Sequence, residues 1–287
     1  NTRIGVNTGN SITSGGNYNV LVGDEAGTAL TTGDGNTAVG FEALKTEDAH
    51  GRNTAVGYQA LKTLNAGAEA VTTTIGYQSG TSLTTGVQNT LVGGLSGDAL
   101  TDADYNVAVG NNTLSSDTKG NKSTAIGYEA LTSQNFSTST DTYNVAVGFQ
   151  AGASVTTGTG NILVGGLVGD ALTEGSSNVA IGQTALTSDT LGSRSVAIGQ
   201  SALFTQNFTS ATNAYNTGVG YFAGANITTG TNNTFIGGLA GDHTTTASQN
   251  TAVGYNDSLV THLQQLPALL RLAMRLFLQA LQEVLTL

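Results

Sequence analysis

Three aspartates recur at one place in a repeated string, and carboxylates are the groups that a glycan-cleaving enzyme would use. Asp98, Asp170 and Asp242 each end a Gly-Gly-Leu-x-Gly-Asp string, at equal intervals along the chain. A glycosidase needs two carboxyl groups about 5–10 Å apart. In the stacked repeat derived below, neighbours in this series lie four rungs apart, or about 19 Å at about 4.8 Å per rung. We therefore interpret them as turn residues. The strings match the calcium motif Gly-Gly-x-Gly-x-Asp only in part, so we predict no metal site.

Other residue types that catalysis would use form no pattern. His50, His243 and His262 stand singly in unrelated contexts, and the 287-residue chain has no cysteine. It contains no phosphate-binding loop, His-x-x-x-His motif or nucleophile elbow. A net charge of −10 with only 9 Lys and Arg leaves no basic stripe for nucleic acid. We therefore expect a protein that is not an enzyme, with no catalytic residue, no cofactor and no nucleic-acid partner.

Aromatic and threonine side chains offer binding chemistry instead. A row of rings could bind sugars, although rings could equally pack beneath a turn or between chains, which we favour. A flat threonine array could bind ice, but the threonine position here also holds residues such as Val20 and Ile162, which suits a core better. Seven aromatic residues directly follow a recurring glycine: Phe41, Tyr58, Tyr77, Tyr128, Phe149, Tyr221 and Tyr255.

A five-residue signature recurs fifteen times and must position all of these side chains. It reads Asn, a β-branched residue, a small residue, Ile or Val, and Gly. A 17-residue step separates successive copies in ten of the fourteen intervals, and the other four intervals are slightly longer. The glycines of the signature are Gly5, Gly23, Gly40, Gly57, Gly76, Gly93, Gly110, Gly127, Gly148, Gly165, Gly182, Gly199, Gly220, Gly237 and Gly254.

A longer, 72-residue period is superimposed on the first. Four places after the signature glycine, two rungs carry Gly and the next two carry Leu, as in Gly97 followed by Leu114. The two 21-residue steps carry matching inserts, QNFSTSTDTYN ending at Asn144 and QNFTSATNAYN ending at Asn216. The unit of duplication is therefore four rungs, and we expect the inserts to bulge from one edge.

The repeat predicts an all-β stacked solenoid, because a 17-residue unit is too short to fold alone. Alternate β-branched residues indicate a strand, in which Thr54 and Val56 share one face and Ala55 takes the other. Such a unit would hold two short strands and two turns. We therefore favour a two-sided β-roll, with a three-sided left-handed coil as the alternative. Fifteen rungs would make a rod roughly 70 Å long.

Two further features concern how the rungs hold together. The core of one rung is thin, so we expect a homotrimer with the small-residue face turned towards a shared axis. We interpret the asparagine that opens the signature as a structural ladder at a corner and not as a row of ligand-binding amides. The ladder comprises Asn19, Asn36, Asn53, Asn89, Asn106, Asn144, Asn161, Asn178, Asn216, Asn233 and Asn250.

Strings such as SVAIGQSAL (195–203), STAIGYEAL (123–131) and NTAVGYQAL (53–61) resemble the head repeats of trimeric autotransporter adhesins. The longer form, with a Thr-Thr-Gly linker, is also similar to repeats in tail-fibre proteins of marine bacteriophages. The resemblance covers residues 1–258. It implies a β-roll with three chains side by side in a surface-exposed fibre.

The C-terminal residues, 259–287, differ abruptly from the array at 1–258. They are rich in leucine and hold the only proline, Pro267, and the only methionine, Met274. Apolar residues at 3-4 spacing would suit a short helix, while Arg271 and Arg275 argue against a membrane span. Our alternative hypothesis is a frame-shifted continuation of the array. Because the chain begins at a signature position without Met, we expect a piece of a longer protein.

These observations lead to one functional prediction with two alternatives. We predict a non-enzymatic structural or adhesive fibre segment that mediates attachment, extracellular on a phage virion or bacterial surface. It would assemble as a homotrimer and contact a cell-surface glycan or receptor. The first alternative is a glycan- or ice-binding solenoid module. The second is a polysaccharide-degrading tailspike.

Overall fold

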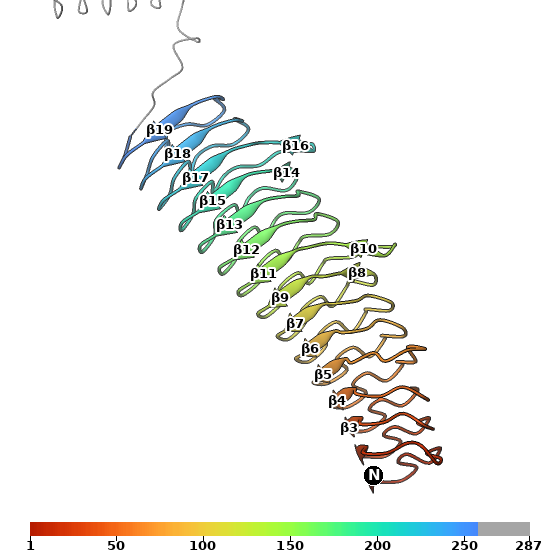
Figure 1. The fold of residues 1–287 in the computed structure, drawn as a ribbon. Helices are drawn as coiled ribbons and strands as arrows, with labels where there is room; N and C mark the ends of the chain where they lie inside the picture. The colour runs from red at the N-terminus through yellow and green to blue at the C-terminus, as the bar shows by residue number, and fades with distance from the viewer. Residues whose placement is uncertain (258–287) are drawn as a thin grey trace, which may run out of the picture.

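A computed structural model describes residues 1–257 as an all-β rod without a helix in that range (Figure 1). Fifteen strands form one parallel sheet in which every strand pairs with the next in chain order, one per rung. The prediction of a β-solenoid with fifteen rungs is therefore confirmed. The predicted Leu-rich tail, 259–287, lies outside the described residues.

The main sheet is built from three-residue strands. They are β1 (Thr2–Ile4), β2 (Val20–Val22), β3 (Thr37–Val39), β4 (Thr54–Val56), β5 (Thr73–Ile75), β6 (Thr90–Val92), β7 (Val107–Val109), β9 (Thr124–Ile126), β11 (Val145–Val147), β12 (Ile162–Val164), β13 (Val179–Ile181), β15 (Val196–Ile198), β17 (Thr217–Val219), β18 (Thr234–Ile236) and β19 (Thr251–Val253). Two small parallel sheets pair β8 (Gly120–Asn121) with β10 (Thr140–Asp141), and β14 (Gly192–Ser193) with β16 (Thr212–Asn213).

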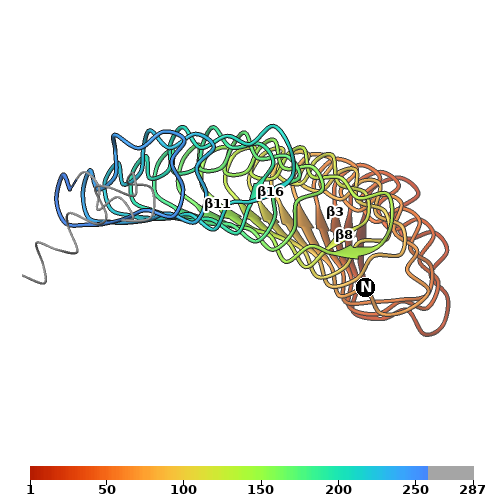
Figure 2. The same ribbon diagram turned by 90° about the horizontal axis from the view of Figure 1, so that it is seen from above.

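Equivalent residues of successive rungs stack directly on one another. In the β3–β4 pair, Ala38 lies opposite Ala55 and Val39 opposite Val56. Each position of the repeat therefore becomes a column that runs along the rod. Figure 2 shows the coils following one another around a common interior, which buried Ala and Leu side chains fill.

The expected orientation of the strand faces is wrong. The middle residue of the strand is the one that points inwards: Ala55 is fully buried, while Thr54 and Val56 are only half-buried. The small-residue column therefore lines the core of each chain and cannot face a shared axis between chains. The reason is geometric. A closed coil made from so short a repeat has a narrow interior, so the side chains beside the opposite wall must be small or matched in volume.

The prediction of two strands per rung is also wrong, because only one side of the coil is a continuous sheet. Left-handed residues recur at fixed places and interrupt extended backbone, as at Arg52 (φ 62°), Gln59 (φ 54°) and Leu61 (φ 53°). Between them, rungs are joined by single backbone hydrogen bonds, such as Leu61 N–H to the Ser79 carbonyl at 3.0 Å. Except in the four coils that also carry β8, β10, β14 or β16, each coil is therefore one short strand closed by hydrogen-bonded turns.

The signature glycine has a direct steric reason. At Gly57 the backbone has φ 141°, and a Cβ there would collide with the carbonyl oxygen of Gly76 in the next rung. A side chain would force the two rungs apart. One glycine per rung is thus needed for stacking at this corner.

The 72-residue period reflects volume compensation inside the core. Leu163 is the buried mid-strand residue of its rung, where most rungs have Ala. A Cβ at Gly152 or Gly169 would lie 2.7 or 2.9 Å from its side chain. The two rungs that follow have a mid-strand Ala, such as Ala180, and carry leucine at the place of Gly169, here Leu186. One large strand residue therefore fills the space beside two glycines, one in its own rung and one in the rung before.

Candidate functional site

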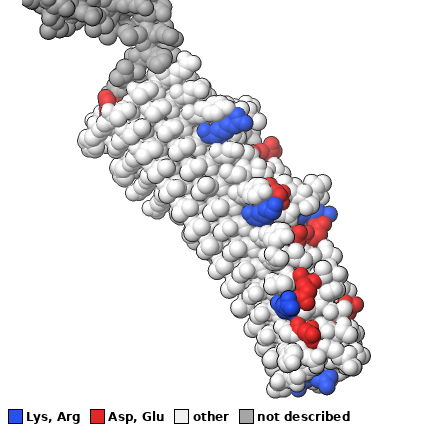
Figure 3. All heavy atoms as spheres, in the orientation of Figure 1, with Lys and Arg blue, Asp and Glu red and all other residues white. Residues whose placement is uncertain are grey.

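The outer face of the main sheet is uncharged from one end of the rod to the other. This face consists of two columns of side chains, which are the first and the last residue of each strand in the main sheet. Both columns contain only Thr, Val and Ile. Several of these side chains are well exposed, including Ile75 at 42%, Ile162 at 41% and Ile236 at 42%. In Figure 3 the Lys, Arg, Asp and Glu side chains gather mainly along one edge, and the strand-bearing part of the rod is almost free of them. We call these two columns the sheet face.

The sheet face has a large outline, although most of its side chains are half-buried and threonine occupies much of its first column. Fifteen strands at about 4.8 Å and a width of about 10 Å give an outline of about 700 Å². Contiguous apolar patches of more than a few hundred Å² usually mark an interaction site. The sequence analysis assigned these columns to the core, so the face appears only once the direction of the strands is known.

The asparagine column lies buried at the corner before each strand. The Asn178 N–H donates to Asn161 Oδ1 at 3.0 Å, and Asn161 Nδ2 donates to the Gly175 carbonyl at 2.9 Å. The same pair of bonds recurs at other rungs, for example from Asn36 N–H to Asn19 Oδ1 at 2.8 Å. These amides therefore satisfy backbone groups of the next rung and are turned away from solvent.

The aromatic residues of the sequence analysis lie at the opposite corner, just after the bend glycine. Phe41, Tyr58 and Tyr77 form a stack with ring centroids 5.4 Å apart, and Tyr128 and Phe149 form another at 5.5 Å. The rings lie at the surface and are not packed beneath a turn, with exposed fractions from 39% for Phe41 to 55% for Tyr77. They form short ladders beside the sheet face.

A small charged cluster borders the first of these stacks. Lys45 Nζ contacts Glu25 and lies 2.6 Å from Glu42, and Lys62 Nζ lies 2.7 Å from Glu42. Hydrogen bonds from Lys45, then Lys62, lower the pKa of Glu42 to about 2 from 4.5. Gln59 also donates to Glu42, at 2.7 Å. The cluster is a structural ion-pair network of buried and half-exposed groups.

The three recurrent aspartates are not brought together. Burial raises the pKa of the Asp98 carboxyl, and its Oδ1 is buried without a hydrogen-bond partner among the described residues. Asp170 accepts a hydrogen bond from Thr187, and Asp242 lies 2.7 Å from His243. The three carboxylates have different surroundings and lie four rungs apart, so the described residues hold no acid pair built from this series.

The inserts are anchored by a buried polar group that the sequence analysis did not single out. Gly120 N–H donates to Asp117 Oδ1 at 3.0 Å, and Gln134 Nε2 donates to Asp117 Oδ2 at 2.6 Å. Gln134 Oε1 in turn accepts from Asn144 Nδ2 at 2.9 Å. Burial raises the pKa of the Asp117 carboxyl, and the Gln134 hydrogen bond opposes that rise. Asp189 and Gln206 repeat the arrangement four rungs later. This recurrence of an Asp and a Gln at the 72-residue period was the sequence signal that could have identified the anchor.

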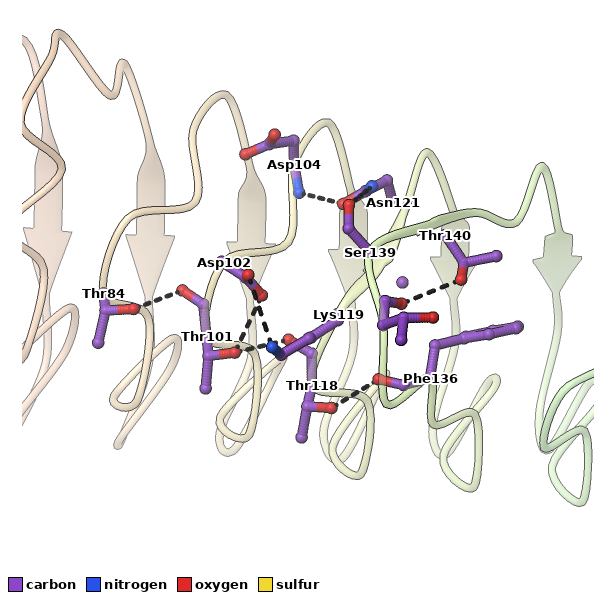
Figure 4. A network of polar contacts seen from close by, with 12 residues as sticks. Thr84, Thr101, Asp102, Asp104, Thr118, Lys119, Asn121, Phe136, Ser139 and Thr140 are labelled. Atoms are coloured by element: carbon purple, nitrogen blue, oxygen red, sulfur yellow. Dashed lines mark hydrogen bonds and ion pairs between the residues drawn. The ribbon is translucent and has the colours of Figure 1, made fainter.

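Contacts near the surface complete the attachment of the insert, as Figure 4 shows. Thr118 Oγ1 donates to the Phe136 carbonyl at 2.8 Å, and Thr140 N–H donates to the Lys119 carbonyl at 3.2 Å. Asn121 Nδ2 donates to Ser139 Oγ at 2.9 Å. The insert is therefore held by the preceding rung along its length.

The first super-repeat carries a variant of this anchor. Glu47, Asp48 and His50 place their metal-ligating atoms within 4.8 Å of one another, a grouping that spacing alone did not suggest. However, the buried Glu47 carboxylate already accepts the His50 N–H at 3.1 Å, just as Asp117 accepts that of Gly120. The group therefore has a structural role that its counterpart shares.

Comparisons with known proteins add no relative: the chain matches no family model, no curated protein and no solved structure. Among residues 1–257, no helix has the length and apolar character that crossing a bilayer would require. Inferences about function therefore depend on the sheet face, the aromatic column and the inserts.

Proposed function

We propose that this chain is a non-enzymatic segment of an extracellular fibre, in which several copies pack through their sheet faces. The observation that carries the proposal is the uncharged, partly exposed sheet face along the whole rod. Two faces of about 700 Å² would bury about 1,400 Å² when they meet, which lies within the range of specific interfaces. Its last-residue column holds only Ile and Val, so this column would form the apolar centre of the contact.

The resemblance to trimeric adhesin heads and phage tail fibres supports three copies and a surface location. In such an assembly the rungs supply length and stiffness, and the inserts repeat at fixed intervals as points of contact. The charged edge and the inserts would remain in solvent while the sheet faces are covered. Attachment to a host or a neighbouring cell follows from this presentation of repeated surfaces.

The assembly can be tested with charges placed on the sheet face. We expect the double variant Ile126→Lys and Ile181→Lys to lose association, because burying unpaired ammonium groups is costly. The matched control adds the same charge on the exposed inserts, as Thr138→Lys with Ser210→Lys. Mass should be measured by sedimentation or light scattering, with circular dichroism to verify folding.

The wild-type chain and the insert control should both show about three times 28.9 kDa, and the face variant 28.9 kDa. A wild-type chain that stays monomeric at micromolar concentration would refute the proposal. So would a face variant that assembles as the wild type does.

A further inference from the structure

The aromatic column has three gaps, each in the rung directly after an exposed ring. Glycine occupies the column position in those rungs, so each ring keeps one uncovered side. The stacking is direct: Leu95 N–H donates to the Tyr77 carbonyl at 2.8 Å, which places Gly94 beside Tyr77. We call each gap a ring slot. The ring and glycine of each slot are Tyr77 with Gly94, Phe149 with Gly166, and Tyr221 with Gly238.

The second slot is open space, and the first and third are bordered closely by a side chain of the next rung. A Cβ at Gly166 would meet nothing within 4 Å, and one at Gly94 would approach only the Asn111 side-chain amide, at 2.9 Å. At Gly238 the nearest atom would belong to the Tyr255 ring, at 3.5 Å. The slot rings are also more exposed than ring-covered neighbours: Tyr77 is 55% exposed against 44% for Tyr58. Among the described residues, the rings of Tyr77 and Phe149 therefore have no ring on the slot side, whereas the Tyr221 ring also contacts the tilted Phe222 ring, with centroids 4.5 Å apart.

The thickness of a slot corresponds to one flat ring. Adjacent rings in the column lie 5.4–5.5 Å apart, so one missing side chain leaves room for one ring-shaped group beside the aromatic face. In the rung beyond the glycine, the column residue forms the far wall. That residue is Asn111 in the first slot, Gln183 in the second and Tyr255 in the third.

The lining of a slot is neutral, apolar on one side and hydrogen-bonding on the other. The aromatic face supplies apolar surface. An amide or a phenol supplies donors and acceptors on the far wall, and no charged residue occupies the column positions of the slots. Aromatic surface with a few convergent polar groups is the usual composition of small-molecule sites.

We propose that each ring slot binds one sugar ring of a neutral glycan, with its C–H face on the aromatic ring and its hydroxyl groups on the far wall. This deepens the proposed adhesive role by naming the class of ligand. A second copy of the chain fits the slots less well. If copies pack in register through the sheet face, each slot lies level with the same rung of the neighbouring copy. That rung also has glycine at the column position, so the neighbour offers no ring to fill the slot.

The three slots recur every four rungs, or about 19 Å apart. A polymeric glycan could therefore engage several slots of one rod at once. Linked sites raise the overall affinity by roughly 10²–10⁴-fold over a single site. Weak individual slots would thus give firm attachment to a surface coated with repeating neutral sugars.

The test fills the slots without removing any side chain. Gly94, Gly166 and Gly238 have no left-handed φ, so Tyr can replace each of them and continue the stack, as Tyr follows the bend glycine in other rungs. The matched control is Phe204→Ala, which removes an exposed ring outside the column. Binding of the full chain should be measured on an array of neutral glycans and on agarose and cellulose beads, with alginate as a charged comparison.

We expect the wild-type chain and the Phe204→Ala control to bind at least one neutral glycan. The triple Gly→Tyr variant should lose roughly 100-fold or more in apparent affinity, because all linked sites are blocked. Absence of binding to every neutral glycan would overturn the inference, as would equal binding by the filled variant. A change of mass in the filled variant would also overturn it by assigning the slots to contacts between copies. A monomer that still binds glycan would instead refute only the fibre assembly.

Discussion

Replacing one buried asparagine of the ladder should weaken the rod at a defined place. Asn161→Ala in β12's rung removes the acceptor of the Asn178 N–H, at 3.0 Å, and the donor to the Gly175 carbonyl, at 2.9 Å. Asn178 and Gly175 are both buried, so water cannot readily replace the lost side chain. Each unsatisfied buried group costs about 1–3 kcal/mol. The expected loss of local stability for the two groups together is therefore about 2–6 kcal/mol.

The effect should be local, because each rung contacts only its neighbours. Amide hydrogen exchange read by mass spectrometry separates the rungs beside residue 161 from distant ones such as β3 and β4. Protection should fall around Asn161, Gly175 and Asn178 and remain unchanged near the N-terminal rungs. Asn65→Ala is the matched control, since the same substitution there removes an exposed side chain.

The natural replacements in the ladder sharpen the expectation. Ser123 stands at an asparagine position, and there Ser123 Oγ bonds to Thr142 Oγ1 at 2.6 Å and accepts from Gln134 Nε2 at 2.9 Å. Rung β12 has no insert to supply such partners, so Asn161→Ser should also destabilise it. A loss below about 1 kcal/mol for Asn161→Ala, or an equal loss for Asn65→Ala, would refute the ladder reasoning.

Three further predictions concern the core, the charged cluster and the insert anchor. Leu163→Ala should lower the free energy of unfolding, measured by urea denaturation, by about 2–5 kcal/mol. Adding Gly169→Leu should restore more than about 1 kcal/mol of it, because the new side chain fills the cavity. Leucine already adopts this left-handed backbone in other rungs. Glu42→Gln should be less stable than the wild type at neutral pH, and the difference in free energy of unfolding should shrink as pH falls from 4.5 towards 2. The reason is that the lowered pKa of Glu42 makes its ion pairs stabilising above pH 4.5, and protonation removes that contribution between pH 4.5 and 2. Gln134→Glu places a second carboxyl 2.6 Å from Asp117 Oδ2, so its melting temperature should fall more at pH 7 than at pH 4.

The periodicity predicted the solenoid because a 17-residue repeat can bury its apolar residues only by stacking. It did not predict which strand face points inwards. Alternation places Thr54 and Val56 on one side of the strand and Ala55 on the other, but the pattern is the same whichever side points into the core. The choice depends on the width of the closed coil, which a small residue such as Ala55, or a large residue beside compensating glycines, can fill. The same limit explains the single strand per rung, because left-handed residues such as Leu61 carry no sequence mark.

The candidate surfaces were visible in the sequence only in part. The spacing predicted that the seven rings form a column. Their exposure depends on the direction that the chain takes after the bend glycine, and spacing does not predict that direction. In the Gly-Gly-Leu-x-Gly-Asp strings the aspartate is the residue that sequence reasoning selects as a candidate, because a glycosidase uses carboxylates. In the structure, the Asp98 carboxylate lies alone in its rung, whereas Gly94 leaves one side of the Tyr77 ring without a neighbouring ring.

The core and the ring slots share one period, and this links the growth of the rod to its binding capacity. The rung with the large buried residue Leu91 also carries Gly94, and Leu163 is paired with Gly166 in the same way. A duplication that placed a large-residue rung directly after a leucine rung would overfill the core, because the large residue needs a glycine in the rung before it. Duplication in units of four preserves packing and adds one slot each time. Longer versions of such a rod should therefore gain valency in steps of one slot per four-rung unit, at a constant spacing of about 19 Å.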